Sequence, residues 1–135
     1  MERGVKILPK PCLCYLKFKI KSDNGIDLVL LDDLEAIRLM WELEARKANK
    51  RIATFDDPDK LITFVQHASK NIRIYVDSDL KKDITGQDVA ERLYKKGYKN
   101  IYLTTAYEAD SFSHMLWIRG IIGKTPPFVN RESHG

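Results

Sequence analysis

The sequence predicts a doubly wound α/β fold, in which helices cover a five-stranded parallel sheet with the strand order 2-1-3-4-5. Two observations lead to this prediction. From residue 28 onward, short apolar runs of strand length alternate with stretches in which apolar residues recur at helical spacing. Charged and polar residues directly follow the apolar runs, and the carboxyl ends of parallel strands meet in one crevice. With 135 residues, the chain is long enough for one domain to bury a core without disulfides.

The first half of the domain contains two predicted strands and two predicted helices. Residues 28–32 are predicted to be a strand, an apolar run that ends at Asp32, and the stretch at about 34–49 is predicted to be a helix. The buried face of that helix is expected to carry Leu34, Ile37, Trp41, Ala45 and Ala48. A strand at 51–55 follows. Asp57 as an N-cap and Pro58 at the first helical position then predict a helix that continues to about residue 68.

The second half repeats the alternation. Residues 72–77 are the third strand, and a loop leads from it to Gly86. The helix that begins there is expected to end near Lys96, because Gly97 is typical of the position after a helix. A strand at 101–105, a helix at about 108–118 and a short strand at 120–123 complete the pattern.

The chain divides into three parts. Residues 26–130 are expected to be the domain, residues 1–25 an N-terminal extension or linker, and residues 131–135 a tail. Apolar residues alternate with lysines at positions 16–21, which predicts a half-exposed strand, and Asn24-Gly25 predicts a tight turn. A hairpin onto the strand at 28–32 conflicts with the predicted sheet, where that strand already has a neighbour on each side. The extension must therefore pack elsewhere, pair with another chain or follow an upstream domain.

Composition argues against several classes of protein. The net charge of +4 is mild, and basic residues stand in short groups broken by acids or apolar positions, without a nucleic-acid-binding motif. No apolar run approaches the ~18 residues of a membrane span, and the N-terminus lacks a signal-peptide core. Cys12 and Cys14 cannot form a disulfide framework and lack a second pair for a zinc site. We therefore expect a cytoplasmic protein that binds neither nucleic acid nor membrane.

Reactive side chains stand at the carboxyl ends of four of the five predicted strands. In chain order these are Asp32 and Asp33, Asp77, Thr104 and Thr105, and Lys124. Carboxylate oxygens suit a hard divalent cation that keeps several waters. Phosphoryl transfer needs alignment and neutralisation of the phosphoryl oxygens more than covalent help. The set therefore predicts a site for a divalent metal and a phosphoryl group.

The order and spacing of these residues resemble the receiver domain of bacterial response regulators. The matching motifs are Leu-Leu-Asp-Asp at 30–33, Tyr-Val-Asp-Ser-Asp-Leu at 75–80, Leu-Thr-Thr-Ala-Tyr at 103–107 and Gly-Lys-Thr-Pro-Pro-Phe at 123–128. The resemblance covers about 28–128 and implies a flavodoxin-like fold. The chain is also similar to receivers joined to the C-terminus of sensor histidine kinases. In that setting, residues 7–10 would be linker material.

The resemblance implies roles for the acids. Asp77 would be the phosphoacceptor, which attacks the phosphorus of a phosphohistidine on a partner. Asp33 and Asp77 would bind Mg²⁺ directly, and Asp32 would act through water. The backbone carbonyl of Asp79 would complete the protein ligands. Asp57 and its neighbour Asp56 are expected to stay out of this site, because the following proline makes a capping role sufficient.

The resemblance also implies roles for the hydroxyl and the ammonium group. Thr105, rather than Thr104, matches the hydroxyl position of the family because Ala106 follows it. Lys124 would bind a phosphoryl oxygen. Asp79 and Tyr107, each two positions beyond a site residue, would set the lifetime of the phosphoryl group by flanking the path of the hydrolytic water.

Two positions depart from the pattern of the family. Lys124 is followed by Thr-Pro-Pro, where receivers have a proline directly, so the turn that aims its ammonium group is expected to differ. Ile121 stands where many receivers carry a switching aromatic residue. Phosphorylation is therefore expected to change the surface of the domain in a way that differs from other receivers.

The expected function is that of a phosphoryl-accepting receiver in a two-component or phosphorelay system, not an enzyme. Its partners would be a sensor histidine kinase or a histidine phosphotransfer protein, and a downstream protein target; it could also form a homodimer. One alternative is a binding-only pseudo-receiver. Another is a haloacid-dehalogenase-like phosphatase, because Asp77-Ser78-Asp79 fits the Asp-x-Asp nucleophile motif. Those enzymes carry a second acid pair after the lysine, whereas Glu132 is the sole acid after Lys124.

Overall fold

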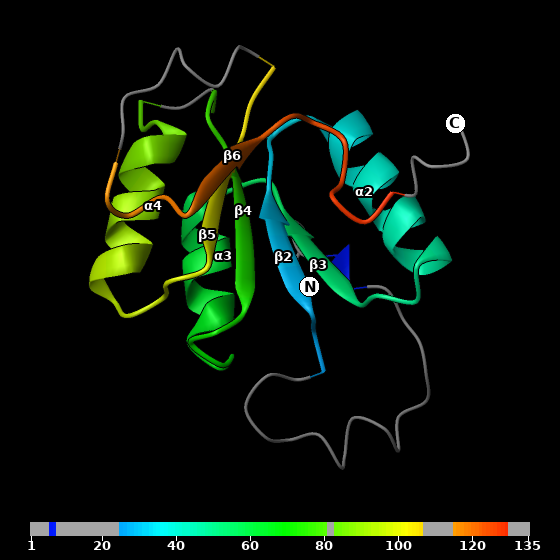
Figure 1. The fold of residues 1–135 in the computed structure, drawn as a ribbon, viewed down its shortest axis with the longest axis horizontal. Coiled ribbons are helices and arrows are strands. Elements are labelled where there is room, and N and C mark those ends of the chain that lie inside the picture. Colours follow the sequence, from blue (N-terminus) through cyan, green and yellow to red (C-terminus); the bar gives the residue numbers. More distant parts are fainter. Residues whose placement is uncertain (1–5, 8–24, 81–82, 107–114, 130–135) are drawn as a thin grey trace.

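The computed structural model describes residues 6–7, 25–80, 83–106 and 115–129 (Figure 1). Its helices are α2 (Glu35–Lys47), α3 (Pro58–Val65) and α4 (Gly86–Lys95). Its strands are β1 (Lys6–Ile7), β2 (Leu28–Leu31), β3 (Ile52–Phe55), β4 (Arg73–Asp77), β5 (Ile101–Thr104) and β6 (Gly120–Ile122). They form a sheet in the order β1-β3-β2-β4-β5-β6.

The five strands from β2 to β6 confirm the predicted sheet. All of their pairings are parallel, and their order β3-β2-β4-β5-β6 is the predicted 2-1-3-4-5. In this order the carboxyl ends of β2 and β4 are adjacent at the centre of the sheet, because Leu31 pairs with Val76. The residues that follow these two strands are therefore placed side by side.

The N-terminal extension adds a short strand at the edge of the sheet. β1 pairs antiparallel with β3, with Lys6 opposite Thr54 and Ile7 opposite Ala53. The extension thus pairs with the outer edge of β3. Strand β2 has β3 and β4 as its neighbours, so the extension does not form a hairpin with β2, in agreement with the sequence argument. The predicted strand at 16–21 lies outside the described residues. Gly25, the second residue of the predicted turn, lies in a turn with φ of 78°.

Two helix starts follow directly from the sequence. Asp57 caps α3 by accepting a hydrogen bond from the Asp59 N–H at 3.0 Å, with Pro58 in the first turn, as predicted. Thr85 and Asp88 form a reciprocal capping box at the start of α4. Gly97, with φ of 104°, follows the end of α4 in the left-handed conformation that glycine adopts without strain.

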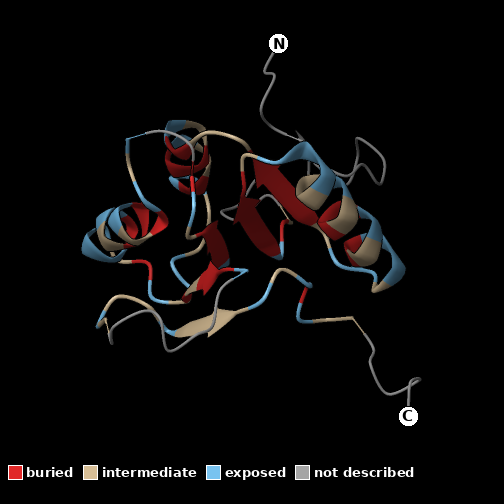
Figure 2. Cartoon of the chain, turned by 90° about the horizontal axis from the view of Figure 1, so that it is seen from above, coloured by how far each residue is buried: buried red, intermediate tan, exposed pale blue. Residues whose placement is uncertain are grey.

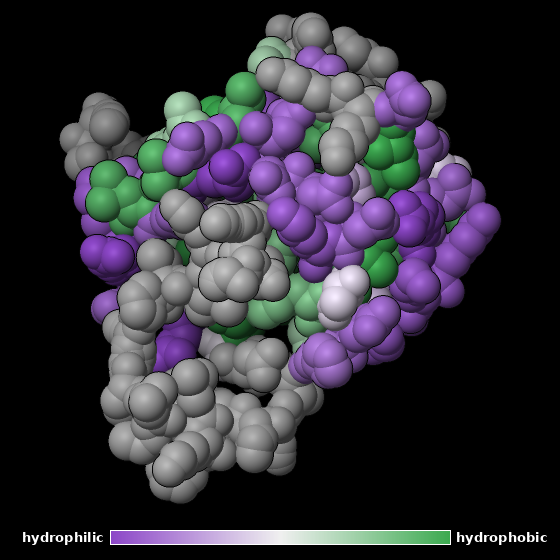
Figure 3. Space-filling view, turned by 180° about the vertical axis from the view of Figure 1, so that it is seen from behind, coloured by the Kyte–Doolittle hydropathy of each residue, from purple (hydrophilic) through white to green (hydrophobic). Residues whose placement is uncertain are grey.

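Helices cover both faces of the sheet (Figures 1 and 2). On one face, α3 and α4 pack on a cluster that includes Val29, Leu31, Ile74 and Val76. On the other face, α2 and Phe128 pack on Leu28, Leu30 and Tyr75. The strands β2 and β3 are fully buried, whereas β6 at the sheet edge is only half-buried (Figure 2). From behind, hydrophilic residues predominate over the side that carries α3 and α4 (Figure 3).

Helix α2 differs from its prediction at both ends. It begins at Glu35, so that Leu34 is the N-cap residue and its side chain is 45% exposed rather than buried. Ala48 is the C-cap residue. The buried face instead includes Glu42, whose carboxylate accepts a hydrogen bond from the Thr54 hydroxyl at 2.5 Å. This bond satisfies a polar group that helical periodicity alone would place at the surface.

The predicted helix at about 108–118 lies mostly outside the described residues. Its last part, residues 115–118, forms a turn closed by the bond from the Ile118 N–H to the Met115 carbonyl at 3.2 Å. Among the described helices, none has the length and apolar character that crossing a bilayer requires.

Candidate functional site

Three carboxylates gather where β2 and β4 end. Asp32 and Asp33 follow β2, and Asp77 is the last residue of β4. Asp32 is 0% exposed and Asp77 is 2% exposed, whereas Asp33 is half-buried. One carboxylate oxygen from each of the three lies within 4.8 Å of the others. The structure thus brings together the acids that the sequence placed at neighbouring strand ends.

Local hydrogen bonds hold two of these acids in place. Asp32 Oδ1 accepts from the Leu34 N–H at 3.0 Å, and the Asp32 backbone carbonyl accepts from Arg38 Nη1 at 2.9 Å. Asp77 Oδ1 accepts from the Asp79 N–H at 3.1 Å. The loop after each strand therefore turns a backbone N–H toward a carboxylate and holds that side chain in one orientation.

Lys124 completes the cluster from the far end of the chain. Its Nζ lies 2.5 Å from Asp77 Oδ1 and 3.0 Å from Asp32 Oδ2. Its backbone carbonyl accepts a hydrogen bond from Trp41 Nε1 at 2.8 Å. The Thr-Pro-Pro turn after Lys124 therefore still directs the ammonium group to the two buried carboxylates.

Burial and charged neighbours shift the pKa of Asp77 and of Lys124. Burial raises the pKa of Asp77 above its ordinary value and the Asp32 carboxylate adds to the rise, while Lys124 and the Asp79 N–H act against it. Burial lowers the pKa of Lys124, but its hydrogen bonds to Asp77 and Asp32 outweigh this effect and the net pKa is raised. Lys124 therefore carries its charge at neutral pH. Three carboxylates face one ammonium group, an arrangement that favours a further cation.

Two threonines end β5 beside the cluster. Thr104 pairs in register with Asp77 and is completely buried, and its hydroxyl has no hydrogen-bond partner among the described residues. Thr105, the hydroxyl that the resemblance implicates, is 3% exposed, and its N–H donates to the Ile122 carbonyl at 3.0 Å. Both threonines thus lie at the carboxyl end of the sheet, where the carboxylates also lie.

The other predicted site residues have different outcomes. Asp79 is exposed and contacts the site through its backbone N–H. Tyr107 lies outside the described residues. Asp57 is the cap of α3, and among the described residues the three-carboxylate cluster contains neither it nor Asp56.

Sequence reasoning missed the contributions of Gly86 and Trp41. A Cβ atom on Gly86 would lie 2.1 Å from the carbonyl oxygen of Asp77, so the loop after β4 closes only with glycine at this position. Helical spacing predicts only that Trp41 lies on a buried face, yet its indole N–H donates to the backbone carbonyl of Lys124. The sequence does offer a signal for Gly86, because this glycine ends the loop that begins at Asp77. It offers no signal for the hydrogen bond of the Trp41 indole.

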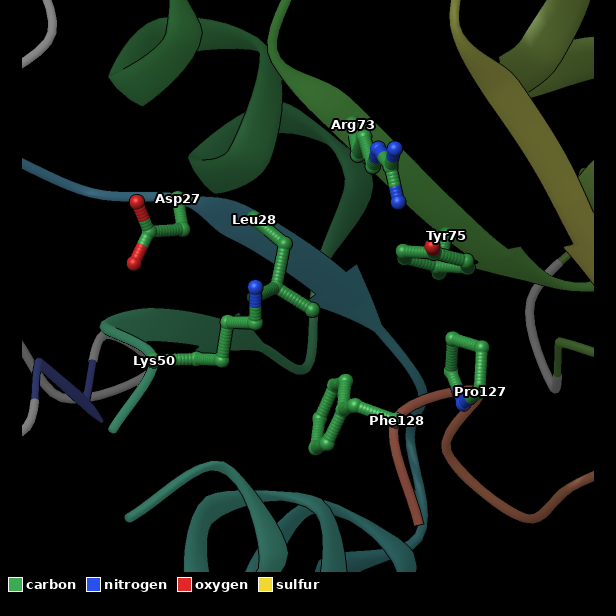
Figure 4. A pocket seen from close by; sticks show the side chains of 7 residues that line it. All are labelled: Asp27, Leu28, Lys50, Arg73, Tyr75, Pro127 and Phe128. Carbon is green, nitrogen blue, oxygen red and sulfur yellow. The ribbon is translucent and has the colours of Figure 1, made fainter. Parts of the chain in front are cut away.

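A cavity of about 340 Å³ lies away from the carboxylates, at the amino ends of β2 and β4 (Figure 4). Its lining consists of Asp27, Leu28, Lys50, Arg73, Tyr75, Pro127 and Phe128. Figure 4 shows the rings of Tyr75 and Phe128 on different sides of this space. None of the predicted site residues lines it, so the cavity and the carboxylate cluster are separate features.

Comparisons with known proteins show the fold. No protein-family model matches the chain, and no curated protein matches it. The response regulator TrrA of Thermotoga maritima, solved in complex with Mg²⁺ and BeF, matches with a TM-score of 0.63 at 22% identity, over 75% of this chain and 88% of that one. A CheY-like receiver domain protein of Methanospirillum hungatei matches with a TM-score of 0.57 at 16% identity, over 78% and 85%.

A third solved structure points the same way. It is a signal receiver domain from Vibrio parahaemolyticus, with a TM-score of 0.60 at 15% identity, over 82% of this chain and 81% of that one. All three proteins are described as response regulators or receivers, and all three match across most of both chains. The flavodoxin-like sheet order agrees with them. The chain therefore has the fold of a response-regulator receiver domain.

Proposed function

We propose that this chain is a phosphoryl-accepting receiver domain of a two-component or phosphorelay signalling system, with Asp77 as the phosphoacceptor. One observation carries the proposal. Asp77 is buried at the end of a central strand, shares its site with Asp32 and Asp33, and has the Lys124 ammonium group 2.5 Å from Oδ1. The likeness in fold to receiver domains supports the same function.

The carboxylates suit Mg²⁺. One oxygen from each of three acids lies within 4.8 Å of the others, and carboxylate oxygen is the ligand type that this hard cation prefers. Asp33 and Asp77 would bind the ion directly, Asp32 would act through water, and the backbone carbonyl of Asp79 would complete the protein ligands. When bound, Mg²⁺ neutralises charge on the phosphoryl oxygens during transfer.

The chain's own residues would then perform the transfer. A carboxylate oxygen of Asp77 attacks the phosphorus of a phosphohistidine on a histidine kinase or phosphotransfer protein. The O–P bond forms as the P–N bond breaks, and the electron pair returns to the imidazole nitrogen, which takes up a proton. Lys124 exchanges its contact with Asp77 for one with a phosphoryl oxygen, and the Thr105 hydroxyl donates to another.

The product is a signalling state rather than a released chemical. A phosphoryl group on Asp77 adds negative charge beneath Lys124 and Thr105, which shifts the balance between two conformations and thereby the affinity for a downstream protein. In this proposal residues 26–130 form the receiver domain, residues 1–25 an extension or linker and residues 131–135 a tail. Phosphotransfer from a histidine kinase would take place in the cytoplasm.

Intact-mass spectrometry tests the proposal. The protein is incubated with acetyl phosphate and Mg²⁺, and we expect the mass of one phosphoryl group to be added. Asp77→Asn should abolish the addition. Asp57→Asn is the matched control, because it makes the same change in an acid that caps α3 and should leave the addition intact. Equal labelling of the Asp77→Asn variant would refute the assignment.

A further inference from the structure

The segment that carries Lys124 has few backbone donors of its own. It follows β6, a half-buried strand at the edge of the sheet. Pro126 and Pro127 lack an N–H group, and the bond that closes this turn, from the Val129 N–H to the Pro126 carbonyl at 3.3 Å, lies beyond Lys124. The ammonium group nevertheless reaches two buried carboxylates. Contacts to the Lys124 backbone itself therefore bear on where its ammonium group lies.

Trp41 on α2 supplies such a contact. Its indole Nε1 donates to the Lys124 carbonyl at 2.8 Å, across 83 positions of sequence. Because its side chain is 0% exposed, water does not compete for this bond. The bond ties the turn after β6 to α2, the same helix whose Arg38 holds the Asp32 carbonyl.

Neighbouring rings fix the direction of the indole. The ring of Tyr75 lies 5.2 Å from that of Trp41 at an interplanar angle of 55°. The ring of Phe128, which belongs to the segment after Lys124, meets Trp41 edge-on at 6.2 Å and 88°. Trp41 is thus packed between β4 and the C-terminal segment, with little freedom to turn its N–H away from Lys124.

We propose that Trp41 is a positioning residue of the phosphoryl site, which holds the Lys124 carbonyl so that the ammonium group stays over Asp77 and Asp32. This inference rests on the proposed function. Trp41 does not touch the reacting atoms and acts through Lys124. In this chain an indole on α2 thereby fixes a turn in which the prolines come one residue later than in the receiver pattern.

A purely structural role would consist of filling the core between α2 and the sheet. Trp41→Phe separates the two roles, because it keeps an aromatic ring and removes the N–H donor. Trp117→Phe is the matched control: Trp117 is half-buried, and its Nε1 has no hydrogen-bond partner among the described residues, so the same substitution removes no bond. Both variants are compared with the wild-type full chain at a temperature where all three are folded.

Two binding constants and one labelling rate give the readout. The affinity for Mg²⁺ alone, measured by calorimetry, should stay within about twofold of wild type in both variants, because the carboxylates are unchanged. At saturating Mg²⁺, Trp41→Phe should weaken beryllofluoride binding and slow acetyl-phosphate labelling by roughly three- to tenfold, the effect of one lost hydrogen bond to a neutral acceptor. Trp117→Phe should match wild type in both measurements.

The outcomes are distinct. Wild-type beryllofluoride affinity and labelling rate in Trp41→Phe would overturn the role of Trp41 and leave the proposed function standing. Absence of labelling in the wild-type chain would overturn both. If Trp41→Phe does not fold, ¹⁵N spectra of the wild-type chain decide: the Trp41 indole N–H resonance should move when beryllofluoride is added with Mg²⁺, and that of Trp117 should not. A Trp41 resonance that stays in place would contradict the inference.

Discussion

The Nζ of Lys124 lies 2.5 Å from Oδ1 of Asp77, and the same ammonium group reaches Asp32 Oδ2 at 3.0 Å. In this arrangement the lysine occupies oxygens that a divalent cation would also use. Lys124 therefore has two opposed effects in the proposed function. It would compete with the metal before phosphorylation and would bind the phosphoryl group afterwards.

Lys124→Met should raise the affinity for Mg²⁺, because it removes the competing charge and keeps an apolar stem of similar length. We expect about a tenfold gain in calorimetric titrations at neutral pH, where the raised pKa of Lys124 keeps the wild-type ammonium charged. The same variant should bind beryllofluoride more weakly at saturating Mg²⁺. Lys47→Met is the control, since Lys47 is exposed and its ion pair is with Glu44, outside the carboxylate cluster. Unchanged Mg²⁺ affinity in Lys124→Met would show that the two cations do not compete.

Asp33→Asn should weaken Mg²⁺ binding by about tenfold or more, because it removes one charged ligand from the three-carboxylate cluster. Asp57→Asn should leave the affinity unchanged, since asparagine also caps a helix and the residue lies outside the cluster. Calorimetric titration of both variants measures the difference. If Asp57→Asn proved the more damaging change, the metal would lie at the end of β3 rather than β2.

Asp77→Asn should stabilise the metal-free protein. Burial raises the pKa of Asp77, so the folded state binds this proton more tightly than the unfolded state does. The stability that protonation contributes is present below the unfolded pKa and is lost as pH rises through the folded pKa. Wild type and variant should therefore unfold alike in acid, and at pH 7 with EDTA the variant should melt about 2–5 °C higher. A lower melting temperature at pH 7 would mean that the Lys124 contact outweighs the cost of burial.

Gly86→Ala should displace the backbone of Asp77 and thereby disrupt the site. The new methyl group would lie 2.1 Å from the Asp77 carbonyl oxygen, a backbone atom that cannot move without shifting the strand end. We expect a fall in melting temperature of about 5 °C or more, together with slower acetyl-phosphate labelling. Gly123→Ala is the matched control, because a Cβ there meets nothing within 4 Å. Wild-type labelling by Gly86→Ala would show that the Asp77 loop tolerates displacement.

The strands and the acid cluster could be predicted because local patterns encode them. Apolar runs such as 28–31 mark buried parallel strands, and parallel pairing puts Asp32 and Asp77 side by side without further information. The cap formed by Asp57 before Pro58 is equally local. Periodicity also predicts α2, but it places the exposed Leu34 on the buried face. Leu34 is the N-cap residue, and because its backbone is extended, its side chain does not follow the helical spacing.

Contacts between distant residues could not be predicted in the same way. The bond between Trp41 and Lys124 depends on where α2 lies over the sheet, and a tryptophan used only for packing would give the same sequence pattern. Lys6 and Ile7 are too few residues to show a period, so their pairing with β3 left no mark in the sequence. The burial of Glu42 depends on Thr54, a partner supplied by another element.

The pairing of β1 with β3 bears on how the protein behaves at high concentration. An unpaired edge strand offers a row of N–H and C=O groups to any other extended chain, and intermolecular association can begin there. The antiparallel pairs Lys6 to Thr54 and Ile7 to Ala53 occupy part of that row with the protein's own backbone. This N-terminal segment thus reduces the length of the β3 edge at which another chain could pair.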